Sequence, residues 1–300
     1  MPDRPPLSIS VGEVLWDVVG DSRTLGGAPT NVSWHCAQLG AEAHVISAVG
    51  NDPLGREALD ILSGRGLGLS ALAVIPDKPT STVDARIDAS GNATYVIHEN
   101  VAWDAIPASP AALALVARAE AVNFGSLAQR GEVCREITRT LLSATPANCI
   151  RVFDVNLRPP FIYQEVLAAG MEMATVVKMN DDELPVIAKL FGWRGDPEAA
   201  MEDLASQYPN ISHIVVTRGA KGAWWHNRHR LTAKPPPRTV KTVDTIGAGD
   251  SVTATVMLGL LKGWEVEKIM LAAMEIASFV CSCRGGMPEL PASLKAEFRE

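Results

Sequence analysis

The sequence predicts an α/β fold in which a mostly parallel sheet is covered by helices on both faces. Short β-branched runs recur along the chain, and longer segments rich in Ala and Leu, of helical character, separate them. Strands that alternate with helices at this spacing form parallel sheets buried on both sides. The runs that we interpret as strands are Ala43–Val49, Ala121–Phe124, Ile150–Asp154, Thr175–Lys178 and His213–Thr217.

The composition supports a large core. Of the 300 residues, 47% are hydrophobic and 20% are charged, and the apolar mass is mostly Ala, Val and Leu. Such a length allows two domains, but α/β folds of this size are commonly single. Because we find no linker and no internal repeat, we expect one domain over residues 1–300.

One stretch departs from the alternation of strands and helices. Residues Thr82–Asp88 and Ala93–His98 are two strand-like runs joined by a Gly-Asn turn, which predicts a hairpin. With a further strand at Glu13–Asp17, we expect a small β-sheet lid formed by segments around 13–26 and 81–99. Its exposed edge predicts a homodimer through the lid, because unpaired strand edges are association sites.

The charge balance excludes some partners. Lys and Arg number 27 against 34 Asp and Glu, a formal net charge of −7, so we expect neither a nucleic acid polymer nor an anionic membrane as partner. Met1–Pro6 lacks the basic start of a secretory signal, and no apolar stretch reaches the roughly 18 residues of a membrane span. The five cysteines are scattered and form no zinc pattern. We therefore expect a cytoplasmic protein with reduced thiols.

The loop that includes Gly247, Ala248, Gly249 and Asp250 is the most informative. Its glycines let backbone N–H groups converge at the start of an apolar helix, where partial positive charge favours an anion. Asp250 would repel a phosphate there unless it faces an incoming hydroxyl and accepts its proton. A helix cap on a plain turn is the alternative.

Two more loops carry polar groups at expected strand or helix ends. Gly26 and Gly27 precede a Pro-initiated helix that begins near Asn31, an arrangement that permits close approach of a small polar ligand. Residues 153–160 combine an acid, an amide and the guanidinium of Arg158 before two prolines. A capped helix start and a solvated loop are the respective alternatives.

On these residues the sequence resembles the ribokinase-like carbohydrate kinases of the PfkB family, and within them bacterial fructokinases. Its N-terminal signature is matched by Gly26, Gly27, Asn31, Ser33, Gly40 and Gly50, and its C-terminal one by Asp244, Thr245, Gly247, Ala248, Gly249 and Asp250. Segments between them agree as well, namely Gly12-Glu13, the Asn156 and Arg158 loop, Asn180–Glu183 and Thr217–Gly222. The resemblance covers essentially the whole chain.

The resemblance implies a ribokinase-like three-layer fold and ATP-dependent phosphorylation of a sugar hydroxyl. Asp250 would be the general base, and the amides of Gly247, Ala248 and Gly249 the anion hole. Those roles suit phosphoryl transfer, which depends mostly on positioning and on oriented N–H groups. A carboxylate with an ordinary pKa of ~3.9 is a weak base that need only take the proton late.

The resemblance also implies the binding residues. For the sugar they are Asp17, Gly27, Asn31 and Arg158, and for the nucleotide Asn180, Thr217, Gly219 and Gly222. Magnesium would enter with ATP and meet Glu183 through water, and Asp244 would be the candidate for a monovalent cation such as K⁺. If Asn180 and Glu183 lie on one helix, their spacing puts them on the same face, whereas simple capping at a helix start is the alternative.

Fructose is the expected acceptor. Kinases of 2-keto-3-deoxygluconate, ribose or nucleosides share the phosphate-side motifs and remain alternatives, as does a non-catalytic sugar- or nucleotide-binding relative. A dinucleotide-dependent oxidoreductase is disfavoured because Val252 occupies the place of the third glycine of its motif. The sequence also lacks the P-loop pattern of another large class of kinases.

Overall fold

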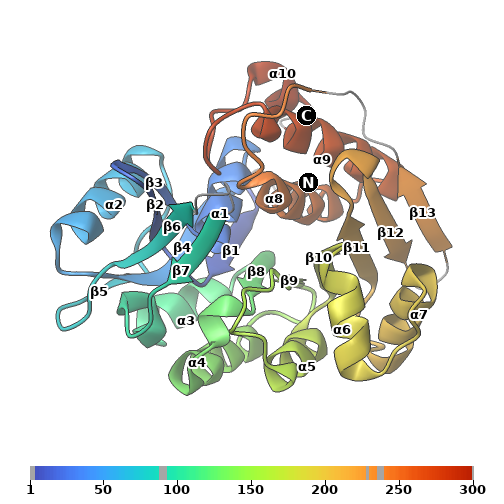
Figure 1. Cartoon of the computed structure of the whole chain (residues 1–300), viewed down its shortest axis with the longest axis horizontal. Coiled ribbons are helices and arrows are strands. Elements are labelled where there is room, and N and C mark those ends of the chain that lie inside the picture. The colour runs from blue at the N-terminus through green and yellow to red at the C-terminus, as the bar shows by residue number, and fades with distance from the viewer. Residues whose placement is uncertain (1–3, 88–92, 228–229, 235–239, 299–300) are drawn as a thin grey trace.

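The computed structural model describes residues 4–87, 93–227, 230–234 and 240–298. Within these ranges two sheets form, with strand orders β13-β12-β11-β10-β9-β8-β1-β4-β5 and β3-β2-β6-β7 (Figure 1). The strands are β1 Leu7–Val11, β2 Leu15–Val19, β3 Ser22–Gly26, β4 Glu42–Gly50, β5 Leu72–Ile75, β6 Ser81–Ile87, β7 Ala93–Ile97, β8 Ala121–Gly125, β9 Ile150–Asp154, β10 Val176–Asn180, β11 His213–Thr217, β12 Ala223–Asn227 and β13 Arg230–Lys234. The helices are α1 Ala28–Gln38, α2 Pro53–Gly64, α3 Pro110–Val116, α4 Glu132–Ser143, α5 Gln164–Met173, α6 Glu183–Phe191, α7 Pro197–Gln207, α8 Ala248–Leu261, α9 Val266–Cys281 and α10 Ala292–Ala296.

The large sheet is parallel from β5 through β11. Its remaining strands, β12 and β13, pair antiparallel at one edge. Successive side chains of a strand point to opposite faces of the sheet. On the parallel strands the side chains of both faces are buried. On β11, for example, Ile214 and Val216 join one hydrophobic cluster while Val215 joins the other.

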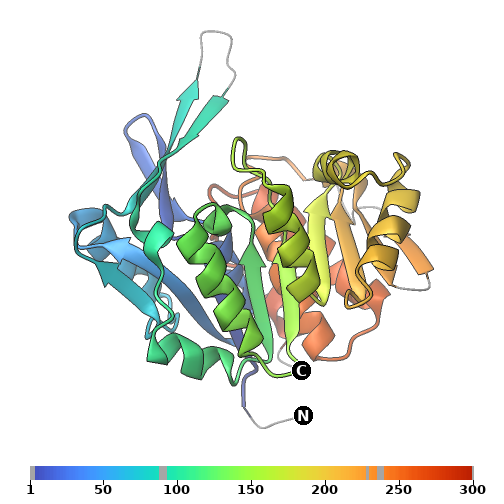
Figure 2. The ribbon, with the colours of Figure 1, turned by 90° about the horizontal axis from the view of Figure 1, so that it is seen from below.

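The two clusters correspond to two helical layers. Apolar residues of α3, α4, α5, α6 and α7 pack on one face of the sheet, and those of α1, α2, α8 and α9 pack on the other. Figure 2 shows this three-layer arrangement, with the small sheet projecting from one end of the molecule. The predicted α/β fold with helices on both faces is therefore confirmed.

The small sheet forms the expected lid. Strand β2 pairs antiparallel with β3 and parallel with β6, and β6 pairs antiparallel with β7. The first lid strand begins at Leu15 and continues to Val19, so the expected strand at Glu13–Asp17 was placed two residues early. The predicted Gly-Asn turn between β6 and β7 lies outside the described residues.

Helix α8 is buried along most of its length, from Asp250 to Gly259. Because it packs between the sheet, α1 and α9, its sequence is apolar nearly all round. Its N-cap is Gly247, whose φ of 77° lies in the left-handed region that glycine adopts without strain. A Cβ at this position would also lie 2.4 Å from the Cα of Gly286.

The topology brings the candidate residues to one edge. Asp154, Asn180 and Thr217 are the last residues of β9, β10 and β11. Since these strands are parallel neighbours, their carboxyl ends meet at one edge, where open α/β sheets bind ligands. No helix among the residues that the structure covers is long and apolar enough to cross a membrane.

Candidate active site

Asp250 lies in the first turn of α8 and is only 9% exposed. Its Oδ2 accepts a hydrogen bond from Asn31 Nδ2 at 2.7 Å, so the N-terminal and C-terminal loops meet at this carboxylate. No side chain of the described residues caps α8 at Gly247. The first N–H groups of a helix have no partner within it. That of Ala248 donates to the carbonyl of Thr245 at 3.3 Å, whereas those of Gly249 and Asp250 are available to an anion.

The surroundings make Asp250 a stronger base than an ordinary aspartate. Burial raises the pKa of its carboxyl to about 6, and the negative charge of Asp154 acts in the same direction. The Lys178 ammonium and the hydrogen bond from Asn31 oppose the rise. The group is still mostly ionised at neutral pH, as a proton acceptor must be.

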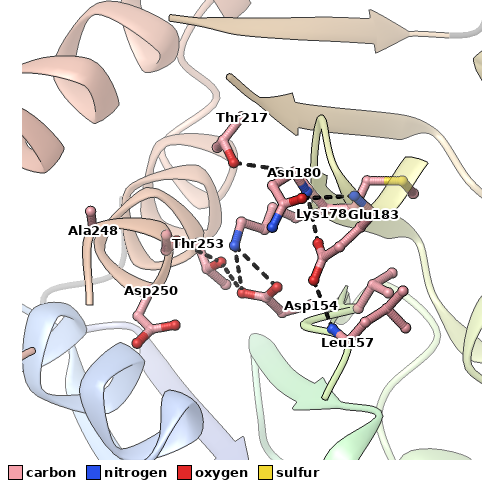
Figure 3. A network of polar contacts seen from close by, with 12 residues as sticks. Asp154, Leu157, Lys178, Asn180, Glu183, Thr217, Ala248, Asp250 and Thr253 are labelled. Atoms are coloured by element: carbon pink, nitrogen blue, oxygen red, sulfur yellow. Dashed lines mark hydrogen bonds and ion pairs between the residues drawn. The ribbon is translucent and has the colours of Figure 1, made fainter. Parts of the chain in front are cut away.

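A buried ion pair lies behind the α8 N-terminus (Figure 3). Lys178 Nζ is 3.1 Å from each oxygen of Asp154, and Thr253 Oγ1 donates to Asp154 Oδ2 at 2.7 Å. A Cβ on Gly249 would lie 2.7 Å from Lys178 Nζ, so the ammonium packs directly under residues 247–249, which we call the anion loop. This ion pair connects strands β9 and β10 to helix α8.

Lys178 keeps its charge in this environment. Although burial acts to lower the pKa of its ammonium, Asp154, Glu183 and Asp250 together raise it above the ordinary value. The sequence analysis missed this residue, since a lysine inside a buried strand run gives no signal of its partners. Only the adjacency of β9 and β10 reveals it.

Asn180 and Glu183 form a reciprocal cap. Asn180 Oδ1 accepts from the backbone N–H groups of Asp182 and Glu183, at 2.9 and 2.8 Å, and Glu183 Oε2 accepts from Asn180 N at 2.8 Å. The expectation that both lie on one helix is wrong, because Asn180 ends β10 and α6 begins at Glu183. The capping alternative is the arrangement that the structure adopts.

The Glu183 carboxylate is compatible with a water-mediated role toward magnesium. Its Oε1 accepts from Leu157 N at 2.7 Å and its Oε2 from Asn180 N, which fixes both oxygens and leaves further lone pairs. Within the described parts of the chain, no three His, Cys, Asp or Glu side chains form a cluster that could hold a metal ion.

The expected nucleotide residues gather at neighbouring strand ends. Asn180 and Thr217 are register partners in the pairing of β10 with β11. The turn that follows needs glycine at two places, since Gly219 has φ 51° and Gly222 has φ 84°. The structure thus places these four residues together, in a group distinct from the sugar-side residues described next.

The expected sugar residues gather around Gly26. A Cβ on Gly26 would lie 3.0 Å from Asp17 Oδ2 and 3.8 Å from Asn31 Oδ1, so both side chains face this glycine. Gly27 has φ 104°, and a Cβ there would lie 2.4 Å from the carbonyl oxygen of Glu13. Burial raises the pKa of Asp17 to about 6. Asn31 Oδ1 is buried without a partner in the described structure and is free to accept from a ligand.

Arg158 and Asp244 contribute in different ways. Arg158 is exposed, and its positive charge opposes the burial-driven rise in the pKa of Asp17 and of Asp250. Asp244 uses both carboxylate oxygens on backbone N–H groups, Oδ1 with Ile246 and Oδ2 with Gly285, each at 3.0 Å. In this structure Asp244 therefore anchors the loop that precedes α8.

Glu13 is a further buried acid that the sequence analysis did not assign to the site. It is 3% exposed, and its Oε2 finds no partner among the described residues. Burial raises the pKa of its carboxyl to about 7, with the charge of Asp250 acting in the same direction and that of Arg158 against it. The Gly12-Glu13 pair was recognised only as part of the family resemblance.

Comparison with known proteins agrees with this geometry. Residues 6–293 match the sequence profile of the pfkB family carbohydrate kinases. Probable fructokinase-5 of Arabidopsis thaliana is 26% identical over 318 residues, covering 97% of this chain and 96% of that protein. A fructokinase of Rhizobium leguminosarum bv. trifolii is 27% identical, covering 88% and 82%.

The fold is also found among solved structures. The crystal structure of a fructokinase with bound ATP from Xylella fastidiosa superposes with a TM-score of 0.85 at 21% identity, covering 98% of this chain and 99% of that one. The chain therefore belongs to the pfkB family of carbohydrate kinases and has the ribokinase-like fold.

Proposed function

We propose that this kinase transfers the γ-phosphoryl group of ATP to a hydroxyl of fructose, with Asp250 as general base. The single observation that carries the assignment of Asp250 is its place at the start of α8, held by Asn31 at 2.7 Å. A carboxylate there stands between the group around Gly26 and the amides of Gly247, Ala248 and Gly249. It can meet an acceptor hydroxyl on one side while the amides hold the transferring group on the other.

The proposed step transfers the γ-phosphoryl group from ATP to the acceptor hydroxyl. The acceptor oxygen forms a bond to the γ-phosphorus, and the bond from that phosphorus to the bridging oxygen of ADP breaks. The hydroxyl proton passes to Asp250 and then to solvent. Charge that develops on the phosphoryl oxygens is stabilised by the amides of the α8 N-terminus and by the ammonium of Lys178 beneath them.

Magnesium bound with the nucleotide would supply further neutralisation of the phosphate charges, with Glu183 holding its waters. Asn180, Thr217, Gly219 and Gly222 would position the nucleotide. From the family resemblance we also propose that a monovalent cation such as K⁺ binds near Asp244.

Fructose is favoured as the acceptor because the curated relatives reported above are named fructokinases. Asp17, Gly27 and Asn31 would hold its hydroxyls, and Arg158 would face the sugar or a phosphate. The paired oxygens of Asp17 accept from vicinal hydroxyls, and Asn31 Oδ1 is available to do the same. Closure of the lid over the sugar would exclude water and limit hydrolysis of ATP.

We place this reaction in the cytoplasm. All five cysteines are free, three of them buried, as suits a reducing compartment. The net charge of −7 supports small molecules, rather than a nucleic acid polymer or an anionic membrane, as partners.

Replacing Asp250 with Asn tests the general base. We expect kcat to fall by about 10²–10⁴, with the KM values for ATP and sugar changed little, because the amide keeps the shape but cannot take the proton. Asp60→Asn, at an exposed position on α2, is the matched control and should behave as wild type. Turnover of Asp250→Asn within a few-fold of wild type would remove Asp250 from this role.

The pH dependence of kcat/KM for the sugar tests the same residue in the native chain. The base works only when ionised, so below about pH 6, the value for its carboxyl in the free enzyme, kcat/KM should fall roughly tenfold per pH unit. Glu13→Gln separates the two buried acids and should keep this acidic limb. If the limb vanishes in Glu13→Gln, Glu13 and not Asp250 is the titrating group.

The acceptor is tested with fructose, ribose, 2-keto-3-deoxygluconate, adenosine and fructose phosphates. ADP release and the mass of the product are measured for each. We expect the highest kcat/KM for fructose, by at least about tenfold, which corresponds to a difference of roughly 1.4 kcal/mol in transition-state binding. A preference for any other acceptor would contradict the choice of fructose but not the kinase assignment. Product formation from none of them would contradict the proposed sugar-kinase activity.

We also propose a homodimer through the lid, supported by the sheet edges at β3 and β7, which have no neighbouring strand in the described structure. Sedimentation at micromolar concentration should give twice the chain mass of 32.0 kDa. A particle of a single chain mass across the concentration range would exclude this association.

A further inference from the structure

Residues 285–290, which follow α9, run across helix α1, and we call them the C-terminal strap. Trp34 Nε1 and Gln38 Nε2 both donate to the carbonyl of Pro288, at 3.0 and 3.1 Å. Gln38 Oε1 also accepts from Leu290 N at 2.6 Å. Pro288 and Leu290 are thereby bound to α1 through side chains of the helix, and Arg65 Nη1 donates to the carbonyl of Met287 at 3.0 Å.

Gly285 and Gly286, at the N-terminal end of the strap, pack against the anion loop. A Cβ at Gly247 would lie 2.4 Å from the Cα of Gly286 and 2.5 Å from its carbonyl oxygen, so the two backbones are in direct contact. Gly285 N donates to Asp244 Oδ2 at 3.0 Å. The position of Gly247, and with it the start of α8, therefore depends on where the strap lies.

Gly286 also packs against the partner of the general base. A Cβ at Gly286 would lie 2.5 Å from Asn31 Nδ2, the atom that donates to Asp250. A single strap residue is thus in contact with the anion loop on one side and with the Asn31–Asp250 hydrogen bond on the other. A displacement of Gly286 would therefore change its contacts with both the anion loop and Asn31.

His35 is the side chain that holds Gly286. It is fully buried, and its Nε2 lies 3.0 Å from the carbonyl oxygen of Gly286. Because a carbonyl only accepts, the proton must be on Nε2. Nδ1 has no partner in the described structure, and burial keeps the pKa of the ring at about 4, so the imidazole is neutral. His35 follows Asn31 by one turn of α1 and lies on the same face.

We propose that His35 is a positioning residue for phosphoryl transfer: its Nε2–H fixes the carbonyl of Gly286, and Gly286 in turn seats Gly247 and Asn31. This proposal rests on the roles proposed for Gly247 and Asp250. An apolar side chain at position 35 would fill the space but leave the buried carbonyl of Gly286 without a donor. The strap would then move to find one, and the anion loop would move with it.

Three variants of His35 separate hydrogen bonding from packing. The terminal amide of Gln reaches the place of Nε2, whereas that of Asn reaches only the place of Nδ1, and Leu has no donor. We expect kcat to fall by about 10- to 100-fold in His35→Asn and His35→Leu, with both KM values changed less than about threefold. His35→Gln should retain kcat within about threefold of wild type.

A second measurement does not depend on turnover. In ¹⁵N-labelled protein, the backbone amide signals of residues 247–249 should shift in His35→Asn and His35→Leu and stay in place in His35→Gln. His44→Gln, at the opposite end of the sheet, is the matched control and should change neither readout. If the amides follow this pattern but the wild type phosphorylates no acceptor, the proposed function fails while the positioning role stands.

The proposal is overturned by either of two results. One is a folded His35→Leu with wild-type kcat, which would show that the carbonyl of Gly286 needs no donor. The other is an equal loss in His35→Gln and His35→Asn, which would show that ring packing and not the Nε2 proton matters. Normal turnover by the folded fraction of a His35→Leu that melts at lower temperature counts as the first result and would make the role of His35 structural only.

Discussion

The hydrogen bond from Asn31 Nδ2 to Asp250 Oδ2 is the contact on which the candidate site depends. It joins two residues that lie 219 positions apart in the sequence, at the starts of helices α1 and α8. Both helices are preceded by a glycine with positive φ, Gly27 and Gly247. A Cβ at Gly27 would collide with the backbone of Glu13 and one at Gly247 with that of Gly286, so both positions require glycine. The two helices meet above β8, a strand that both of them contact.

The second constraint is electrostatic. Asp154, Lys178 and Asp250 are all buried, so each carries a desolvation cost that the others must offset. Replacing such a pair by apolar residues is often neutral or stabilising, so stability alone does not explain it. Its position does, because the ammonium of Lys178 lies under Gly249 and adds positive potential where the peptide dipoles of α8 already point. Asp154 holds the ammonium there and at the same time raises the pKa of Asp250.

The fold could be predicted from the sequence because its signals are local. Runs such as His213–Thr217 are continuous and β-branched, and the structure places strand β11 at the same residues. The anion loop could be predicted as well, since its glycines and Asp250 are adjacent in the sequence. Lys178 and His35 could not, because their roles depend on partners that only the fold supplies: Asp154 on a neighbouring strand and Gly286 on the C-terminal strap. The capping of α6 by Asn180 and Glu183 was among the predicted alternatives, because its contacts are local in the sequence.

The net negative charge of the chain disfavours binding of an anion, whereas groups within the candidate site favour it. A chain of net charge −7 repels anions at long range, yet screening limits that repulsion to about 8–10 Å at physiological salt. Within this distance the free N–H groups at the start of α8 and the Lys178 ammonium present positive charge to an anion. The same local field keeps Asp250 usable as a base: burial raises its pKa to about 6, and Lys178 with Asn31 prevents a further rise that would leave it protonated at neutral pH. An ordinary exposed aspartate would be a weaker base by roughly two pKa units. The burial that imposes a desolvation cost on the folded protein therefore also makes Asp250 a better proton acceptor.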